Sequence, residues 1–390
     1  HFFLPFIVIE YFVVTAWTNP NDFAALLALK STWNNVPPNW SGSDPCGSGW
    51  DGISCINNRV VSITLASINL NGQLSSDITA LSELQILDLS YNPGMTGPLP
   101  TTIGNLVKLT SLILVGCGFS GVIPSSIGSL QQLVYLSLNS NNFIGEIPPS
   151  VGMLSNLYWL DLADNKLSGS IPVSSGSIPG LDMLANTKHF HFGNNQLSGQ
   201  IPPSLFSSNL SLIHLLLENN RLTGTIPSTL GLVQSLQVLR LDRNSLSGSV
   251  PLNFNNLTSL QELCVDSCTQ CHCRYLANNM LNGPLPNLSG MNLLNYVDMS
   301  NNSFQAANFP SWFSSLQILT TIVMENTYVQ GQLNASLFSL YQLQSVNLKN
   351  NNISAQLDIG STQSSQLRLI DLQNNSIRSF VQRGVYSVDI

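Results

Sequence analysis

Hydrophobic residues return along the chain at a nearly constant interval. Four segments, which start at Leu133, Leu157, Leu212 and Leu236, share the pattern L-x-x-L-x-L-x-x-N-x-L-x-G-x-I-P. Leucines that alternate with polar residues are typical of a strand that buries one face. One unit cannot bury that face alone, but stacked units can. The pattern therefore predicts a solenoid with one long parallel sheet.

One polar position follows the strand in each unit, and we call it the ladder position. About thirteen units are recognisable, with this position at Ile68, Asn92, Cys117, Asn141, Asn165, Asn195, Asn220, Asn244, Asn279, Asn302, Thr327, Asn351 and Asn375. An asparagine side chain can satisfy buried backbone groups of its own and the next turn. Cys117 should replace it as a small buried donor. The G-x-I-P segment predicts a bend, and stretches such as SSIGSLQQL predict a short helical return.

Two steps between units are longer than the rest. The step from Asn165 to Asn195 carries extra residues rich in Gly, Ser and Pro, which predicts a loop insertion on the return segment beside one flank of the sheet. The step from Asn244 to Asn279 contains CVDSCTQCHCR at residues 264–274. Removing these residues restores a regular unit, so this insertion interrupts a strand, whereas solenoid insertions usually lie in loops.

The cysteine-rich insertion 264–274 allows four interpretations. The one we favour is a splice-boundary or gene-prediction artefact, because its removal restores the register. A disulfide-bearing surface loop and a redox switch are alternatives, and His272 and Arg274 could lower thiol pKa values in the second. A zinc site at Cys268, Cys271, His272 and Cys273 ranks last, because adjacent ligands on one short loop make a poor cage. We therefore predict no metal site.

The composition favours a secreted glycoprotein. Only 8% of the residues are charged, the net charge is −7, and the chain has no Lys/Arg cluster, which argues against binding to nucleic acid or anionic membranes. Acceptors for N-glycosylation are predicted at Asn39, Asn209, Asn256, Asn287, Asn301, Asn334, Asn352 and Asn374. The apolar residues 1–17 fit a signal-peptide remnant with cleavage after Ala16. Since the chain lacks an initiator Met and a basic start, we expect it to be a fragment or the product of an incomplete gene model.

The repeat resembles the leucine-rich repeat, and L-x-G-x-I-P marks its plant-type version. Residues 18–59, with NPNDFAALLALKSTW and DPCGSGWDGISC, resemble the N-terminal cap of that family, and residues 60–390 hold the repeats. Within the cap, Cys46 and Cys55 should form a disulfide in an oxidising compartment. NTKHFHFGNNQLSG and LNYVDMSNNSF are similar to the ectodomains of plant leucine-rich repeat receptor-like kinases, closest to subgroup VIII.

This resemblance implies an α/β solenoid: a superhelix with a concave parallel β-sheet, short helical or irregular returns and an N-terminal cap. It also implies an extracellular, ligand-sensing domain at the plasma membrane or cell wall. Its partners would be a peptide or protein ligand and a co-receptor, and it would need no cofactor. The chain lacks kinase Gly-rich, H-R-D and D-F-G motifs, so we expect it to be non-catalytic, although a full-length parent could be a Ser/Thr kinase. A secreted repeat protein without a kinase, such as a defence-related inhibitor, is the alternative, and an enzyme is the least supported reading.

Solenoids bind partners with the concave strand face. The outward positions there predict a ligand-binding surface made of Tyr135, Trp159, Asp161, His189, His191, His214, Glu218 and Arg240. The same outward position in four successive units holds Tyr135, Trp159, His189 and His214, which should therefore form one row. A single residue of this kind is more often part of ordinary surface packing. We expect the histidines to be partly protonated in mildly acidic cell-wall fluid. They would then hold an anionic group of the ligand together with Arg240.

Overall fold

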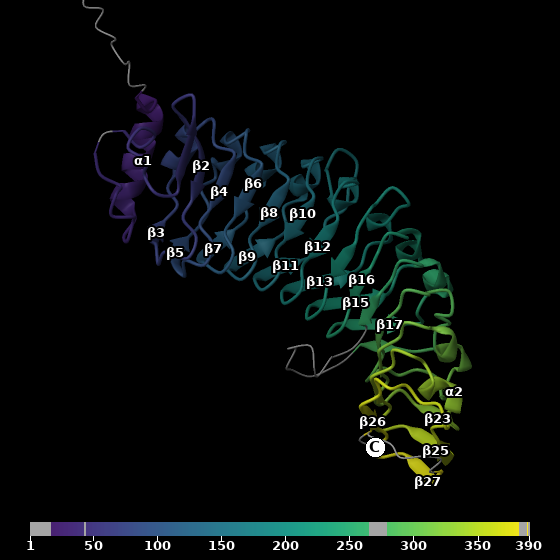
Figure 1. Cartoon of the computed structure of the whole chain (residues 1–390). Helices are drawn as coiled ribbons and strands as arrows, with labels where there is room; N and C mark the ends of the chain where they lie inside the picture. The colour runs from purple at the N-terminus through teal and green to yellow at the C-terminus, as the bar shows by residue number, and fades with distance from the viewer. Residues whose placement is uncertain (1–16, 43, 265–278, 382–387, 389–390) are drawn as a thin grey trace, which may run out of the picture.

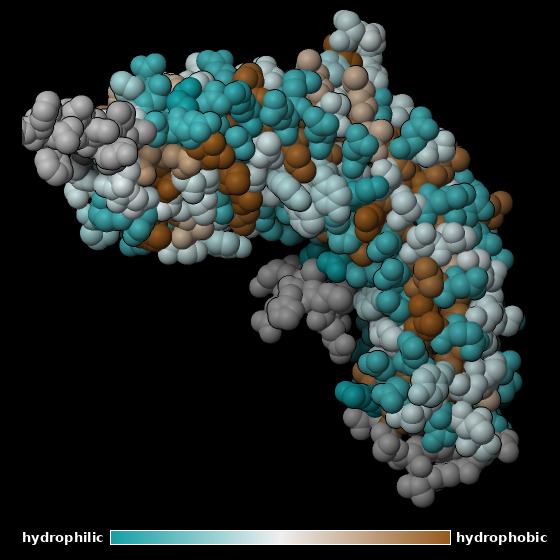
Figure 2. All heavy atoms as spheres, turned by 45° about the horizontal axis from the view of Figure 1, so that its top comes forward, coloured by the Kyte–Doolittle hydropathy of each residue, from teal (hydrophilic) through white to brown (hydrophobic). Residues whose placement is uncertain are grey.

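The repeating units stack into a single curved solenoid (Figure 1). The computed structural model describes residues 17–42, 44–264, 279–381 and 388. The predicted signal segment, apart from Trp17, and the predicted insertion 264–274, apart from Cys264, lie outside these residues. Figure 2 shows hydrophobic side chains scattered among hydrophilic ones on the face in view.

The Leu-x-Leu segments form the predicted parallel sheet, which the cap strand β1 extends to 14 strands. From β2 onward every strand pairs in parallel with its neighbours, and only β1 runs antiparallel to β2. Its strands, in spatial order, are β1 Ile53–Ile56, β2 Arg59–Thr64, β4 Ile86–Asp88, β6 Ser111–Ile113, β8 Tyr135–Ser137, β10 Trp159–Asp161, β12 His189–His191, β14 His214–Leu216, β16 Val238–Arg240, β18 Glu262–Cys264, β20 Tyr296–Asp298, β22 Thr321–Val323, β24 Ser345–Asn347 and β26 Leu369–Asp371.

The L-x-G segments form two further parallel sheets. The first contains β3 Asn71–Gln73, β5 Gly94–Gly97, β7 Gly118–Val122, β9 Asn142–Glu146, β11 Lys166–Gly169, β13 Gln196–Gln200, β15 Arg221–Thr225, β17 Ser245–Gly248 and β19 Met280–Leu281. The second contains β21 Ala307–Asn308, β23 Val329–Gly331, β25 Asn352–Asp358 and β27 Ser376–Val381. Gly121 and Gly145 have φ near +78°, which explains glycine at this bend.

The return segments are mostly short 3₁₀ helices. They are η1 Ser76–Ala80, η2 Ile103–Asn105, η3 Ser125–Ser129, η4 Pro149–Met153, η5 Leu181–Met183, η6 Pro203–Leu205, η7 Ser228–Leu232, η8 Leu252–Asn256 and η9 Ser311–Ser315, with one α-helical turn, α2 Ala335–Phe338. Strands stack at about 4.8 Å, whereas the returns are bulkier, so the stack curves with the 14-stranded sheet on its concave side. The extra residues after β11 lie on the return side, where Ser175 bridges to Ile178.

The buried asparagine ladder ties neighbouring units together. Asn141 donates from Nδ2 to the carbonyl oxygens of Leu114 and Leu138, and its Oδ1 accepts from the Phe119 amide. Cys117 takes this position in its unit as predicted, because its buried thiol donates to the Leu89 carbonyl. The assignment of Ile68 to the ladder is wrong, since its side chain is 36% exposed. That first unit packs against the cap, where Asn34 bridges to Asn71, and has no preceding repeat.

The N-terminal cap closes the core with a helix and stacked tryptophans. Helix α1, Pro20–Thr32, begins after Asn19, whose side chain accepts from the Asn21 amide. Trp40 and Trp50 are buried with ring centroids 4.9 Å apart. The Asp22 carboxylate, also buried, accepts from Arg59 and from the Val60 amide, which joins the helix to the first parallel strand. A disulfide connects Cys46 to Cys55 within this cap.

Removing the cap disulfide should lower the free energy of unfolding by about 2–3 kcal/mol, because the bond closes a short loop in the unfolded chain. Urea denaturation of the unmodified protein and of a Cys46→Ser/Cys55→Ser variant measures the difference. Equal midpoints and slopes for the two proteins would contradict a stabilising role.

The sheet remains regular up to the start of the cysteine-rich insertion. Cys264 ends β18, where it pairs with Arg240 of β16 and Asp298 of β20. On the far side, Asn279 occupies the ladder position, donating to the Leu241 carbonyl and accepting from the Leu246 amide. The ladder is therefore continuous across the unit that carries the insertion.

Candidate ligand-binding surface

The predicted row of side chains lies on four adjacent strands. Tyr135 pairs with Trp159, Trp159 with His189 and His189 with His214 in direct register across β8, β10, β12 and β14, and Val238 of β16 follows. This confirms that the row is contiguous. Side chains alternate between the two faces of each strand. Leu160 and Phe190 are fully buried in the core, so the residues on either side of them face outward and form the row. We call Tyr135, Trp159, Asp161, His189, His191 and His214 the aromatic–histidine band.

The rings of the band contact one another closely. Trp159 and His189 have centroids 4.1 Å apart, and His189 and His214 have centroids 4.5 Å apart. Tyr158, which precedes β10, packs 5.6 Å from His189 and 6.1 Å from Tyr135. Tyr135 is 44% exposed, whereas His189 is only 7% exposed. The band thus offers an exposed aromatic end at Tyr135 and a packed histidine cluster beside it.

The histidines differ in their surroundings. Burial, followed by the nearby His214, His191 and Lys188, lowers the pKa of His189 to about 4. Burial and His191 also lower the pKa of His214. Consequently His189 is neutral in mildly acidic fluid, and the expectation that it is partly protonated there is wrong. An anionic ligand group would gain no charge–charge attraction from this residue.

The charged residues next to the band are already partnered. Arg240 contacts the Glu262 carboxylate from Nε at 2.9 Å and from Nη2 at 2.6 Å. Asp242 accepts from Arg243 Nε at 3.0 Å. An anionic group of a ligand would therefore compete with the Glu262 carboxylate for Arg240. Sequence spacing alone did not reveal this contact.

Glu218 is buried, so its side chain does not form part of the accessible surface. It is 8% exposed and lies over Gly193, where a Cβ atom would come within 2.4 Å of Glu218 Oε1. Within the described part of the chain its Oε2 has no hydrogen-bond partner. Burial, reinforced by Asp242, raises the pKa of Glu218 to about 7. Burial likewise raises the pKa of Asp242 to about 6, against the attraction of Arg243.

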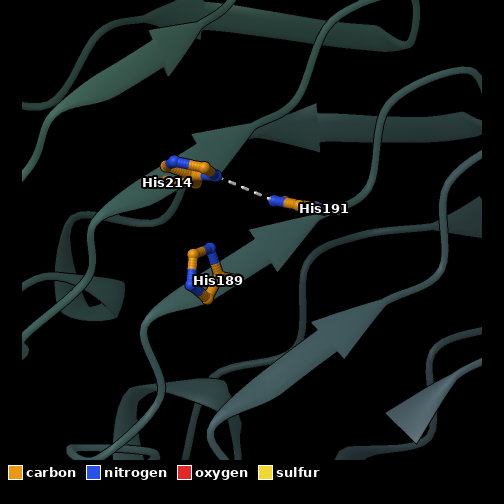
Figure 3. A group of neighbouring side chains, drawn as sticks. All are labelled: His189, His191 and His214. Atoms are coloured by element: carbon orange, nitrogen blue, oxygen red, sulfur yellow. Dashed lines mark hydrogen bonds between the residues drawn. The ribbon is translucent and has the colours of Figure 1, made fainter. Parts of the chain in front are cut away.

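Sequence reasoning placed the three histidines on one surface but did not recognise that their ring nitrogens converge closely enough to share a metal ion. One ring nitrogen from each of His189, His191 and His214 lies within 4.8 Å of the others (Figure 3). His191 contacts Asp161 through Nδ1 and His214 through Nε2, both at 3.3 Å. The signal available in the sequence was H-x-H in one strand with a histidine at the same register in the next unit.

Seven of the eight predicted glycosylation acceptors have exposed side chains, and Asn301 is half-buried. None of the eight belongs to the aromatic–histidine band. No residue of the band would therefore carry a glycan itself.

Comparisons with known proteins agree with this architecture. Residues 19–56 match the family described as "Leucine rich repeat N-terminal domain", and seven segments between residues 83 and 257 match "Leucine Rich Repeat". A probable leucine-rich repeat receptor-like protein kinase of Arabidopsis thaliana is 54% identical over 335 residues, which cover 85% of this chain and 34% of that relative. The chain thus spans about a third of the length of this relative.

Two solved structures resemble the solenoid. The ectodomain of the Arabidopsis receptor kinase GASSHO1/SCHENGEN3, in complex with CASPARIAN STRIP INTEGRITY FACTOR 2, matches with a TM-score of 0.77 and 26% identity over 91% of this chain and 47% of that one. The plant peptide hormone receptor RGFR1, in complex with RGF2, matches with a TM-score of 0.62 and 25% identity over 78% of this chain and 54% of that one.

The chain belongs to the leucine-rich repeat family. Within it, the chain is similar to a plant leucine-rich repeat receptor-like protein kinase and to the ectodomain of a plant membrane receptor kinase. In the described segments, neither α1 nor α2 has the length and apolarity needed to cross a membrane.

Proposed function

We propose that this chain is the ligand-sensing ectodomain of a plant receptor-like kinase and that it binds an extracellular peptide on the aromatic–histidine band. The observation that carries the proposal is the unbroken row of Tyr135, Trp159, His189 and His214 on four adjacent strands of the concave sheet. Clustered aromatic rings at the centre of a concave surface are typical anchors of protein interfaces. The complexes formed by GASSHO1/SCHENGEN3 and RGFR1 support a peptide as the ligand.

The chemistry of the band favours apolar and hydrogen-bonding contacts over charge pairing. His189 is neutral at mildly acidic pH, and Arg240 is held by Glu262. A peptide would therefore stack a side chain on Tyr135 or Trp159 and form hydrogen bonds with Asp161 and the half-buried imidazole edges of His191 and His214. Tyr and Trp give large contact areas at a small cost in side-chain entropy.

The wider setting follows from the same proposal. The full protein would enter the secretory pathway, stand at the plasma membrane or cell wall, and carry glycans on the predicted acceptors. The ectodomain itself would be non-catalytic, and a co-receptor would join the peptide-bound complex.

Replacing Trp159 by alanine should weaken peptide binding by about tenfold or more, because it removes the ring that contacts both His189 and His191. The probe is a short peptide selected from a random library on the immobilised, secreted domain, and its Kd is measured by calorimetry. Tyr341→Ala is the matched control, since Tyr341 is 74% exposed and lies on a return segment after α2. Unchanged affinity in Trp159→Ala, or an equal loss in both variants, would contradict the proposed surface.

A further inference from the structure

Three histidines on neighbouring strands point their rings toward a common point in Figure 3. His189 and His191 come from β12, and His214 comes from β14 directly opposite His189. One ring nitrogen of each lies within 4.8 Å of the other two. Neutral imidazole is the commonest metal ligand in proteins and suits Zn²⁺, Cu²⁺ and Ni²⁺.

The spacing of two of these nitrogens matches metal coordination. His191 Nε2 and His214 Nδ1 are 3.3 Å apart. A tetrahedral ion with Zn–N bonds of about 2.05 Å holds its ligand nitrogens about 3.3 Å from one another. An ion placed between the two rings would thus replace their direct contact without separating the strands, which are fixed by the sheet register.

The third histidine supplies an independent observation. His189 is more than nine-tenths buried, and its Nδ1 has no hydrogen-bond partner within the described residues. A buried polar nitrogen without a partner is rare and costly, so it requires an explanation. Its ring centroid lies 4.5 Å from that of His214 and 5.6 Å from that of His191, so the ring lies beside both other imidazoles.

Asp161 completes the arrangement from the adjacent strand β10. Its Oδ2 lies 3.3 Å from His191 Nδ1, so the Nδ1–H group can donate to the carboxylate and leave the Nε2 lone pair free. Carboxylate–histidine–metal triads of this kind orient the imidazole and raise its basicity as a ligand.

We propose that His189, His191 and His214 form a transition-metal site that binds Zn²⁺, with Asp161 as the partner that orients His191. Three protein ligands leave one coordination position open, as in zinc sites that accept an exogenous ligand. That position faces the concave side of the sheet, where it could take a carboxylate or imidazole group from a bound molecule. The proposed site differs from the sequence-based expectation of no metal site. It does not depend on the peptide-binding proposal, because it requires no peptide.

Calorimetric titration with Zn²⁺ alone, together with the absorption spectrum of added Co²⁺, tests the site. To remove competing ligands, every protein in the series carries serine at Cys264, Cys268, Cys271 and Cys273 and alanine at His272. The parent should bind one Zn²⁺ per chain and give the intense visible bands of tetrahedral Co²⁺. His191→Phe and His214→Phe should each weaken Zn²⁺ binding by about 100-fold or more, and Asp161→Asn by about 10–100-fold.

Two controls keep the result interpretable. Tyr341→Phe changes an exposed aromatic residue on a return segment, outside the aromatic–histidine band, and it should bind Zn²⁺ as the parent does. The circular dichroism spectrum of each variant reports whether it is folded, and Asp161→Asn keeps the size of the side chain. A parent that binds no Zn²⁺, or folded histidine variants that bind it with the parent's affinity, would overturn the proposal.

Discussion

Replacing Asn220 by alanine should lower the free energy of unfolding by about 3 kcal/mol. The buried side chain donates from Nδ2 to the carbonyl oxygens of Phe192 and Leu217, and its Oδ1 accepts from the Leu197 amide. Alanine would leave that amide buried without its partner and would break the connection between neighbouring units. Because stability in a solenoid depends on nearest-neighbour interfaces, the loss should affect the whole cooperative unit.

Urea denaturation followed by circular dichroism measures this loss. Asn142→Ala is the matched control, because Asn142 is exposed on β9 and its replacement should change stability by less than about 0.5 kcal/mol. Cys117→Asn, which installs the common residue at a ladder position, should be tolerated. A loss below about 1 kcal/mol for Asn220→Ala would show that the ladder does not hold the units together.

Glu218→Gln should remove a large part of the pH dependence of stability between about pH 5 and 7. Burial raises the pKa of Glu218 from 4.5 to about 7, so the folded protein binds a proton more tightly than the unfolded chain does. The stability from this group is present in full below pH 4.5 and is lost as the pH rises through about 7. The protein should therefore be more stable in mildly acidic fluid, by about 1–3 kcal/mol, through this carboxyl group.

Denaturation curves at pH 5, 6, 7 and 8 test the sign as well as the size of this effect. The Glu218→Gln variant should become more stable than the unmodified protein as the pH rises, while Asp242, whose pKa is raised to about 6, keeps a smaller slope of the same sign in both proteins. Glu146→Gln, at an exposed carboxylate of β9, should leave the slope unchanged. Parallel pH profiles for the unmodified protein and Glu218→Gln would contradict the assignment.

The repeat pattern predicted the fold because each unit repeats the same physical problem. The strand leucines must be buried, and the turn after them must satisfy backbone groups away from water, so Leu160 and Asn141 could be placed from spacing alone. The register of the concave row followed for the same reason. Ile68 was misplaced because the cap packs on the first unit and removes the need for a buried asparagine there.

The chemistry of the candidate surface was less predictable, because it depends on how side chains pack within the row. Spacing puts His189 beside His214, but its burial follows from contacts with Tyr158 and Trp159, and that burial keeps it neutral. The contact between Arg240 and Glu262 joins residues from different units, and so does the convergence of three imidazoles. Sequence reasoning looked for metal ligands in the cysteine-rich segment and overlooked ligands separated by one repeat.

The central claim, that ligands bind the aromatic–histidine band, is tested most directly by site-specific photo-crosslinking. A benzophenone amino acid is placed at Tyr135 in the band or at Leu232, which is 46% exposed on the return helix η7. Each protein is irradiated with the peptide fraction of plant extracellular fluid, and the products are identified by mass spectrometry. We predict peptide adducts at position 135 that unlabelled selected peptide displaces, and none at position 232. Adducts confined to position 232, or adducts at 135 that the peptide does not displace, would contradict the account.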